Sequence, residues 1–453
     1  MKLKTMLCLA LAAMLLVSCL TGCRGVVDPV PGTEPGGTKE PAPDGTKEPA
    51  PGDSTEPRVD PEDPAATLLS AVVNAKALGF SEFDNQLVEF LKQTGKAEEN
   101  FTVSPLSFKA ALTLAALGAE GETRDQLLKA LGFADLDGLR AWYATVLDGV
   151  DGFEEFFAQL EQEAAEWAAY FPGSSNSRER TAAYEVVNSV WSNLDLPGEF
   201  RKSFLEDVAN ACRAEAYSAH AAQLADAVNA WVNEKTRGLI PSILGDASNT
   251  SAVLVNALYL KTGWEDGFGK LEDMNFTAVT GETVRKPAMG QTSHMPYYAD
   301  AETQLVSVPL QGGVSMVFVL GDDTGLAEKL ARAEYKLVDV TVPMFDVETS
   351  LDQKELVNYL KLMGCENMFT DAAEFDPMYT DALCVADIIQ KAKVHIDEEG
   401  LEAAAVTAMM MEATAMPGEP ETPEVFVADR PFSFYILKDG ETPELLFWGQ
   451  IVR

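Results

Sequence analysis

The sequence predicts an α+β fold with antiparallel or mixed sheets, built as one large domain. Helix patterns dominate the early part of the domain and strand patterns the later part, an order typical of α+β proteins. Hydrophobic residues make up 47% of the 453-residue chain and include 22 Phe and 6 Trp, so a substantial core can form. No low-complexity stretch divides the chain after its N-terminal segments, so we expect a single domain over residues 65–453.

Three helices are predicted from the residues at their ends. Ser104 offers a capping hydroxyl and Pro105 an N1 proline ahead of an apolar run. Thr123 and Gln126 have the spacing of a capping box before a second helix. Glycines follow the second and third runs as stop signals. The three runs are 106–117, 127–131 before Gly132, and 225–237 before Gly238, the last with Val228, Trp231, Val232 and Lys235 on one face.

Five strands are predicted in the later part of the domain. Each is a short apolar run rich in β-branched or aromatic residues, which is the pattern of a half-buried or buried strand. The runs are 253–260, 305–310, 314–320, 335–342 and 432–437.

The N-terminus has the pattern of a bacterial lipoprotein export signal. Lys2 and Lys4 precede an apolar stretch over residues 7–20, which is short for a membrane span. The stretch ends in Leu-Thr-Gly-Cys at Cys23, which resembles the lipobox at which a lipidated cysteine becomes the new N-terminus. A weaker match lies at residues 16–19, and an ordinary signal peptide or an uncleaved anchor is the alternative. Acyl chains on Cys23 would hold the protein on a membrane facing outward, with some of it released.

A tether is expected between this cysteine and the domain. Residues 24–64 contain no aromatic side chain and carry ten of the 24 prolines of the chain. Such a segment cannot bury enough apolar surface to offset its ordering entropy. The expected organisation is a signal peptide over 1–22, the lipidated cysteine and tether over 23–64, and the domain over 65–453.

Charge and composition disfavour several function classes. Lys plus Arg number 34 against 71 Asp plus Glu, a formal net charge of −37, so nucleic acid is not an expected partner. After Cys23 three cysteines remain, an odd and sparse set that argues against a disulfide framework. The three histidines have no metal-ligand spacing, and motifs for hydrolases, phosphate binding and dinucleotide binding are missing. We therefore expect no metal, no cofactor and no enzymatic activity.

The most unusual segment lies near the C-terminus, over residues 398–411. By composition it is a helix that leads into a Pro-rich surface loop over 412–424. An alternating pattern favours a strand instead, because uncharged side chains occupy every second position. A segment that suits loop, helix or strand is what a conformational switch requires. The alternating positions are Leu401, Ala403, Ala405, Thr407, Met409 and Met411.

Six segments in order resemble the conserved motifs of the serpins, over essentially all of residues 65–453. One resembles the N-x-x-x-S-P-x-S opening of a serpin helix, another the VNAxYFKGxW strand, and a third the ADRPF motif near the C-terminus. Six motifs in the right order and spacing are specific. They lie at 100–107 (NFTVSPLS), 118–133, 228–244, 255–264 (VNALYLKTGW), 398–405 and 428–432 (ADRPF).

The resemblance implies a serpin fold of three β-sheets with eight or nine helices and an exposed reactive-centre loop. It implies an irreversible inhibitor of serine proteases, or alternatively cysteine proteases, that works as a monomer. The protease cuts the loop, and the cut loop inserts into the central sheet while still bound as an acyl-enzyme. A non-inhibitory serpin that acts as a surface binding protein is the alternative.

The resemblance also assigns roles to individual residues. Family spacing places the scissile bond between Thr414 and Ala415, with Met411 and Met416 as runners-up. No Lys or Arg lies over residues 401–427, which favours elastase-, subtilisin- or chymotrypsin-like targets. The hinge is Glu398, Glu399, Gly400, Leu401, Glu402, Ala403, Ala404 and Ala405, and the sheet-opening cluster is Ser104, Ser107, Asn188, Asn256 and Gln390, with Trp264 at the insertion point.

Three positions depart from the family pattern. Leu401 stands where Thr, Ser or Val is usual, and its bulk is expected to slow insertion. Gln390 replaces a histidine, although its amide can both donate and accept hydrogen bonds. The stretch 415–430 is several residues longer than in many members, which leaves the scissile bond uncertain by a few residues.

Overall fold

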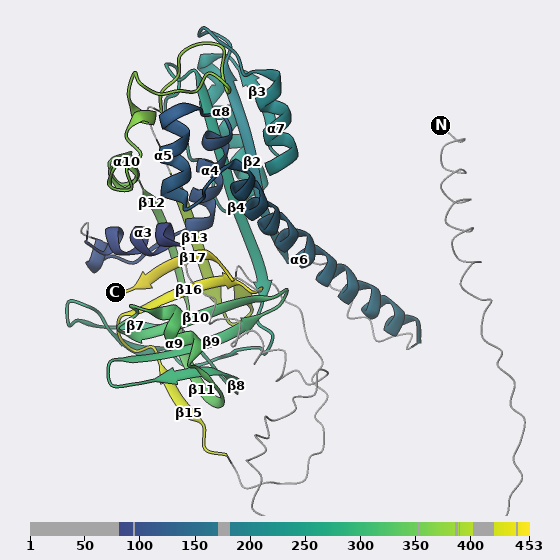
Figure 1. Cartoon of the computed structure of the whole chain (residues 1–453). Helices are drawn as coiled ribbons and strands as arrows, with labels where there is room; N and C mark the ends of the chain where they lie inside the picture. The colour runs from purple at the N-terminus through teal and green to yellow at the C-terminus, as the bar shows by residue number, and fades with distance from the viewer. Residues whose placement is uncertain are drawn as a thin grey trace, which may run out of the picture. The chain divides into compact units, whose positions relative to one another are not determined.

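The computed structural model describes residues 81–93, 96–170, 182–351, 353–385, 388, 390–401, 421–440 and 443–453. These residues form eight α-helices and 17 strands, and the strands build sheets of nine, six and two strands (Figure 1). The predicted α+β class, with three sheets and eight or nine helices, is confirmed.

The helices gather mainly around one end of the molecule, with α4 at their centre (Figure 1). Eleven of the 13 residues of α4 are buried, as expected for a helix that is apolar on all sides. The helices are α3 (Glu82–Gln93), α4 (Pro105–Leu117), α5 (Gly121–Leu131), α6 (Leu136–Tyr170), α7 (Lys202–Cys212), α8 (Ala221–Lys235), α9 (Leu326–Ala331) and α10 (Gln353–Leu362).

The predicted start of α4 is confirmed. The helix begins at Pro105, and the Ser104 hydroxyl accepts a hydrogen bond from the Ser107 amide at 3.1 Å. The predicted stop of α5 is also confirmed, because Gly132 takes a left-handed conformation with φ of 84°. Both ends are set by residues adjacent in sequence, and local patterns predicted them for that reason.

The predicted capping box of α5 is wrong. The helix begins at Gly121, so Thr123 lies inside its first turn. The Thr123 hydroxyl instead accepts from the Glu374 amide at 3.0 Å. The Gln126 side chain accepts from the amides of Glu366 and Asn367, both at 3.0 Å. Both polar side chains are thus hydrogen-bonded to a loop that lies far away in the sequence.

The five predicted strands are all present and extend by up to three residues at an end. The third predicted helix is also present, but α8 begins four residues before residue 225, at Ala221, and ends at Lys235. Its apolar face packs as expected, with Val228, Trp231 and Val232 buried.

The six-stranded sheet is the central sheet of the molecule. All its pairings are antiparallel except that between its last two strands, and β4 runs along its middle (Figure 1). The order is β12 (Phe345–Leu351), β13 (Gln390–Asp397), β14 (Gly400–Leu401), β4 (Ala252–Gly263), β2 (Ala183–Asn193) and β3 (Glu215–Ala219).

The nine-stranded sheet lies at the opposite end from most of the helices (Figure 1). Its order is β1 (Phe101–Val103), β17 (Glu444–Ile451), β16 (Phe432–Lys438), β10 (Val314–Gly321), β9 (Thr303–Leu310), β8 (Ala288–Ala299), β11 (Glu334–Pro343) and β15 (Glu424–Val427), with β5 (Gly269–Lys270) paired to β8. The two-stranded sheet is β6 (Met274–Thr277) with β7 (Thr283–Lys286).

No helix within the described ranges has both the length and the apolarity needed to cross a bilayer. In the same ranges, no three His, Cys, Asp or Glu side chains come together as a metal site.

Candidate functional site

The candidate site is a gap in the central sheet between β13 and β4. At one end of the gap lies β14, only two residues long and hydrogen-bonded to both neighbours. Gly400 pairs with Asp397 and Gly263, and Leu401 pairs with Ile396 and Thr262. Because one strand fits between them, β13 and β4 stand about 9–10 Å apart here, two strand spacings. Within the described residues no pairing joins β13 directly to β4.

A tight turn delivers the chain from β13 into this position. The Asp397 carboxylate accepts from the amides of Glu399 at 2.9 Å and Gly400 at 3.2 Å. Gly400 has φ of 142°, and a Cβ there would lie 2.3 Å from the Thr262 carbonyl oxygen. Only glycine therefore allows the chain to approach β4 this closely.

Trp264 closes the same end of the gap. Its indole N–H donates to the Asp397 carbonyl at 3.0 Å, and its ring packs on Phe268 with centroids 4.7 Å apart. The side chain is 3% exposed. Trp264 therefore ties the end of β4 to the turn that starts the hinge, at the place where the resemblance put the insertion point.

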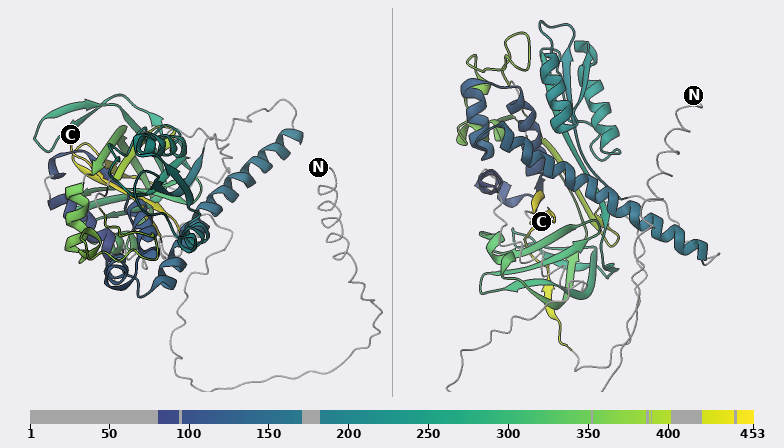
Figure 2. Two further views of the ribbon diagram at one scale, coloured as in Figure 1. Left: turned by 90° about the horizontal axis from the view of Figure 1, so that it is seen from above. Right: turned by 45° about the vertical axis from the view of Figure 1, so that its right-hand side comes forward.

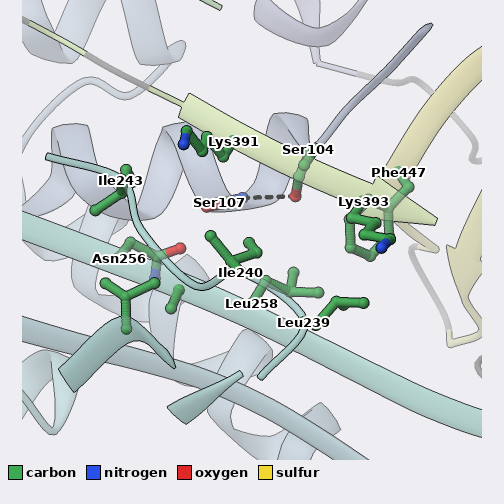
Figure 3. Close-up of a pocket in the computed structure, with 13 residues that line it drawn as sticks. Ser104, Ser107, Leu239, Ile240, Ile243, Asn256, Leu258, Lys391, Lys393 and Phe447 are labelled. Carbon is green, nitrogen blue, oxygen red and sulfur yellow. Dashed lines mark hydrogen bonds between the residues drawn. The ribbon is translucent and has the colours of Figure 1, made fainter. Parts of the chain in front are cut away.

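Beyond Leu401 the gap is lined by side chains from both faces of the sheet (Figure 3). Ser104 and Ser107 come from the start of α4 on one face, and Ile240 and Ile243 come from the chain after α8 on the other. The walls are strand residues. They are Asn256, Ala257, Leu258 and Leu260 of β4, and Lys391, Ala392, Lys393, Val394 and His395 of β13, with Phe447 of β17.

The chain after α8, residues 236–244, is here named the cover segment. In the view of Figure 3, Leu239, Ile240 and Ile243 appear over the gap between the two strands. Side-chain hydrogen bonds hold the segment to α8: the Thr236 hydroxyl accepts from the Ile240 amide at 3.0 Å, and the Asn229 carbonyl oxygen accepts from the Ile243 amide at 2.8 Å. Apolar side chains of this segment thus cover the gap from the face of the sheet on which α8 packs.

The predicted sheet-opening residues form two separate hydrogen-bonded groups beside the gap. In the first, Gln390 and Ser104 exchange hydrogen bonds: the Gln390 amide N–H donates to the Ser104 carbonyl at 2.8 Å, and its oxygen accepts from the Ser104 amide at 3.4 Å. The Ser104 hydroxyl donates to the Leu446 carbonyl at 2.7 Å. The amide of Gln390 therefore acts as both donor and acceptor.

The second group joins β4 to β2 and α6. The Asn256 side chain donates to Asn188 at 3.0 Å, and Asn188 donates to the Tyr143 hydroxyl at 2.6 Å. Burial raises the pKa of Tyr143 far above its ordinary value, so the phenol stays neutral. The side-chain carbonyl oxygen of Asn256 is buried and has no hydrogen-bond partner among the described residues. A buried acceptor without a donor lowers the stability of the fold.

Positive charge lines the β13 side of the gap. Lys391 and Lys393 both border it, and the Lys393 ammonium lies 3.6 Å from the Asp346 carboxylate on β12. At the mouth the Glu398 carboxylate lies 4.0 Å from Lys270, a loose and exposed pair. A surface pair of this kind contributes little to stability. The mouth is therefore held by backbone pairing and by Trp264 rather than by charge.

Some predicted site residues lie outside the described residues. These are the lipidation site Cys23, the hinge residues Glu402, Ala403, Ala404 and Ala405, the scissile pair Thr414 and Ala415, and the runners-up Met411 and Met416. Sequence reasoning, for its part, missed Leu239, Ile240 and Ile243 of the cover segment. A clue was available, because apolar residues follow the helix stop at Gly238 where a polar loop is usual.

The fold, and a central sheet in which only the two residues of β14 separate β13 from β4, point to one family of proteins. The chain belongs to the serpin family: the family model described as serpin (serine protease inhibitor) matches residues 80–453. Members of this family are not enzymes, in agreement with the expected lack of enzymatic activity.

Two curated relatives and one solved structure illustrate the match. Serpin-ZXA of Oryza sativa subsp. japonica is 31% identical over 393 residues, covering 79% of this chain and 91% of that protein. Antichymotrypsin-2 of Bombyx mori is 28% identical over 370 residues, covering 76% and 90%. The crystal structure of Serpin48 from Tenebrio molitor has a TM-score of 0.63 at 24% identity, covering 87% of this chain and all of that one.

Proposed function

We propose that this protein is a suicide inhibitor of serine proteases. A protease attacks the reactive-centre loop as a substrate and forms an acyl-enzyme. The severed loop then enters the gap between β13 and β4 as a new strand and carries the protease with it, so that the acyl-enzyme is not hydrolysed. The observation that carries the proposal is the pairing of β14 with both β13 and β4, because β14 already occupies the first two positions of that strand.

The gap has the chemistry that an inserted strand requires. Of the eight residues of β13, only Ile396 and Asp397 pair with β14, so six remain for an entering strand. Each new backbone hydrogen bond contributes about 0.5–1.5 kcal/mol. The alternating uncharged side chains of the hinge would face the apolar core on one side.

Leu401 favours the inhibitor over a non-inhibitory serpin that acts only as a surface binding protein. Leucine at this position was expected to slow insertion because of its bulk. In the structure the side chain is seated between the two strands and is 2% exposed. Its bulk is therefore accommodated before any cleavage, and the small residues Ala403, Ala404 and Ala405 follow it.

The loop sequence supports elastase-, subtilisin- or chymotrypsin-like targets, cut at Thr414–Ala415 or at Met411 or Met416. Small and medium apolar residues fit the apolar primary pockets of such enzymes, and the name of the Bombyx mori relative, an antichymotrypsin, agrees with this class. We further propose that the protein is exported, anchored through lipid on Cys23 to the outer side of a bacterial membrane, and held off the surface by the 23–64 tether.

The test is to mix the protein with a panel of serine proteases, including pancreatic and neutrophil elastase, and to run denaturing gels. A complex that survives denaturation supports the proposal. Cleavage of the loop without a complex, for every protease that cuts it, contradicts the proposal and favours the surface binding protein. Mass spectrometry of the released C-terminal peptide locates the scissile bond.

The Ala405→Arg variant tests whether insertion is required. A charged side chain at an inward-facing position of the entering strand would block its passage, so this variant should be cleaved as a substrate and form no complex. Ala404→Arg is the matched control, since the neighbouring position faces solvent in the inserted strand and should keep most of the inhibition. Full inhibition by Ala405→Arg would contradict the mechanism.

A further inference from the structure

The end of β4 that receives the hinge has no strand neighbour on its other side. The pairing of β2 with β4 ends at Lys261, so within the described residues Thr262 and Gly263 have no partner on β2. On the side of the gap they pair with Leu401 and Gly400. Both residues of β4 are buried, and buried backbone groups need hydrogen-bond partners. Another element must therefore hold this end of the strand.

The turn between β9 and β10, residues 311–313, takes that place and is here named the brace. The Gln311 amide donates to the Gly263 carbonyl at 2.9 Å, and the Thr262 hydroxyl donates to the Gln311 carbonyl at 2.8 Å. The Gln311 side chain donates to the Trp264 carbonyl at 3.4 Å. One residue of the brace is thus hydrogen-bonded to three successive residues at the end of β4.

The brace is itself held from behind by two other elements. Phe153 and Phe157 of α6, a helix of 35 residues that extends beyond the body of the protein, pack against Gly312 (Figure 2). Gly312 has φ of 81°, and a Cβ there would lie 2.5 Å from the first ring and 3.1 Å from the second. The Gly313 carbonyl accepts from the Asp439 amide at 2.9 Å. The position of the brace is therefore fixed independently of β4.

The Thr262 hydroxyl makes the shorter of the two side-chain bonds between the brace and β4. Its distance of 2.8 Å is ordinary for a hydroxyl donor, whereas the 3.4 Å of the Gln311 amide is long. Thr262 is 0% exposed, so no bulk water competes for this bond. In the motif VNAxYFKGxW that residues 255–264 resemble, glycine stands where this chain has Thr262. A glycine could not make the bond.

We propose that Thr262 is a positioning residue for the hinge, and that its hydroxyl bond to the brace favours trapping over release of a cut protease. The proposal rests on the proposed function. Entry of the cut loop competes with hydrolysis of the acyl-enzyme. A hinge already held in register on a fixed β4 starts to insert without a search, because its ordering has been completed before cleavage. If the end of β4 is loose, insertion begins later and hydrolysis has more time.

The variants Thr262→Val and Thr262→Ser separate this role from packing. Valine keeps the shape of threonine and removes the hydroxyl, whereas serine keeps the hydroxyl and removes a methyl group. A packing role would make serine the worse replacement, and the positioning role makes valine the worse one. The matched control is Thr113→Val on α4, since Thr113 is also 0% exposed and its hydroxyl donates at 2.8 Å to the carbonyl of Lys109 in its own helix.

The first measurement is hydrogen–deuterium exchange of the intact protein at residues 397–401, which needs no protease. We expect exchange there to be about fivefold faster in Thr262→Val than in the wild type, and to change less than about twofold in Thr262→Ser and Thr113→Val. Unchanged exchange in Thr262→Val overturns the proposal. Equal acceleration by Thr113→Val also overturns it, because the effect would then be a general loss of stability.

The second measurement is the number of inhibitor molecules consumed for each protease molecule trapped, with a protease that forms a complex with the wild type. This number should rise about threefold for Thr262→Val and less than about 1.5-fold for Thr262→Ser and Thr113→Val. An unchanged number for Thr262→Val overturns the role in trapping and leaves the inhibitor proposal standing. If the wild type traps no protease, the proposed function fails and the role in trapping fails with it, while exchange still decides whether Thr262 positions β14.

Discussion

At the scale of single residues, the mouth of the gap depends on a glycine and a tryptophan. Gly400 brings the hinge against β4, and Trp264 joins β4 to the turn before the hinge. The sequence predicted both positions through the family resemblance. The reason for the glycine needed the structure, because only the neighbouring strand shows what a side chain would meet.

Replacement of Gly400 by alanine should disrupt the pairing of β14 with β4. The new methyl group would lie 2.3 Å from the Thr262 carbonyl oxygen, and the positive φ adds strain. We expect the intact protein to lose about 1–3 kcal/mol of stability and its loop to become more sensitive to proteases. Gly132→Ala is the control, since its φ of 84° is also positive but nothing lies within 4 Å. Equal losses for the two variants, in denaturant unfolding, would contradict the close contact.

A buried lysine provides a second test at this scale. The Lys109 ammonium on α4 lies 3.1 Å from the Asp84 carboxylate and contacts Glu444, and Lys109 and Asp84 are almost fully buried. Glu444 also accepts from the Trp142 indole at 3.0 Å. Replacement of Lys109 by methionine should cost about 3–5 kcal/mol, because it leaves two carboxylates without their cation. The triple variant Lys109→Met, Asp84→Asn, Glu444→Gln should recover much of that loss in urea unfolding.

The pH dependence of this loss has a definite sign. Burial lowers the pKa of Lys109, but Asp84 and Glu444 raise it by more, so the net shift is upward from 10.5. A lysine whose folded pKa is raised contributes its full stability below the unfolded pKa and loses it as the pH rises through the folded pKa. The stability gap between the wild type and Lys109→Met should therefore be constant from about pH 6 to 9 and narrow above about pH 10.5. A gap that widens there would contradict this assignment.

At the scale of elements, the cover segment and β13 show why sequence reasoning was incomplete. β13 alternates buried and half-buried residues along its whole length, which is the pattern of a strand. It was not predicted as a strand because three charged residues and a histidine make its sequence look polar. The cover segment has no repeating pattern, so its role shows only in its position over the gap between β13 and β4. Similarly, the capping box of α5 was wrong because Thr123 and Gln126 bond to a distant loop. The five apolar strands and the start of α4 needed only their own residues, and they were predicted.

Weakening the cover segment should favour insertion. Ile240 is 8% exposed and lines the gap from one face of the sheet, so Ile240→Ala should destabilise the intact protein by about 2 kcal/mol. It should also raise the fraction of cleavage events that end in a covalent complex, because the entering strand displaces less apolar contact. Leu362→Ala, at a site 68% exposed, is the control and should change neither quantity. A lower trapped fraction for Ile240→Ala would show that the segment guides the strand instead of opposing it.

At the scale of the whole molecule, we expect the open gap to make the intact form less stable than the cleaved form. Six residues of β13 and the facing part of β4 lack a strand between them among the described residues. An inserted loop that pairs on both sides would add on the order of 10 kcal/mol. For a domain of this size, this should raise the unfolding temperature by about 10 °C or more.

Calorimetry of the intact protein and of protein clipped once in the loop checks this expectation. The clipped chain must be kept with both fragments, and a clip placed outside the loop serves as the control. If the loop-clipped protein melts at or below the temperature of the intact protein, insertion does not occur and the inhibitor mechanism falls.

By itself, the sequence determined the α+β class, the family, the start of α4, the end of α5 and the five apolar strands. These features follow from local propensity, from periodicity and from motifs whose residues lie close together in the chain. Only the tertiary structure decided that β13 and β4 stand apart, that Leu401 fits between them and that the cover segment lies over the gap. It also decided that α6, which extends beyond the body of the protein (Figure 2), packs against the turn at Gly312. Those facts join residues more than a hundred positions apart, and no local pattern contains them.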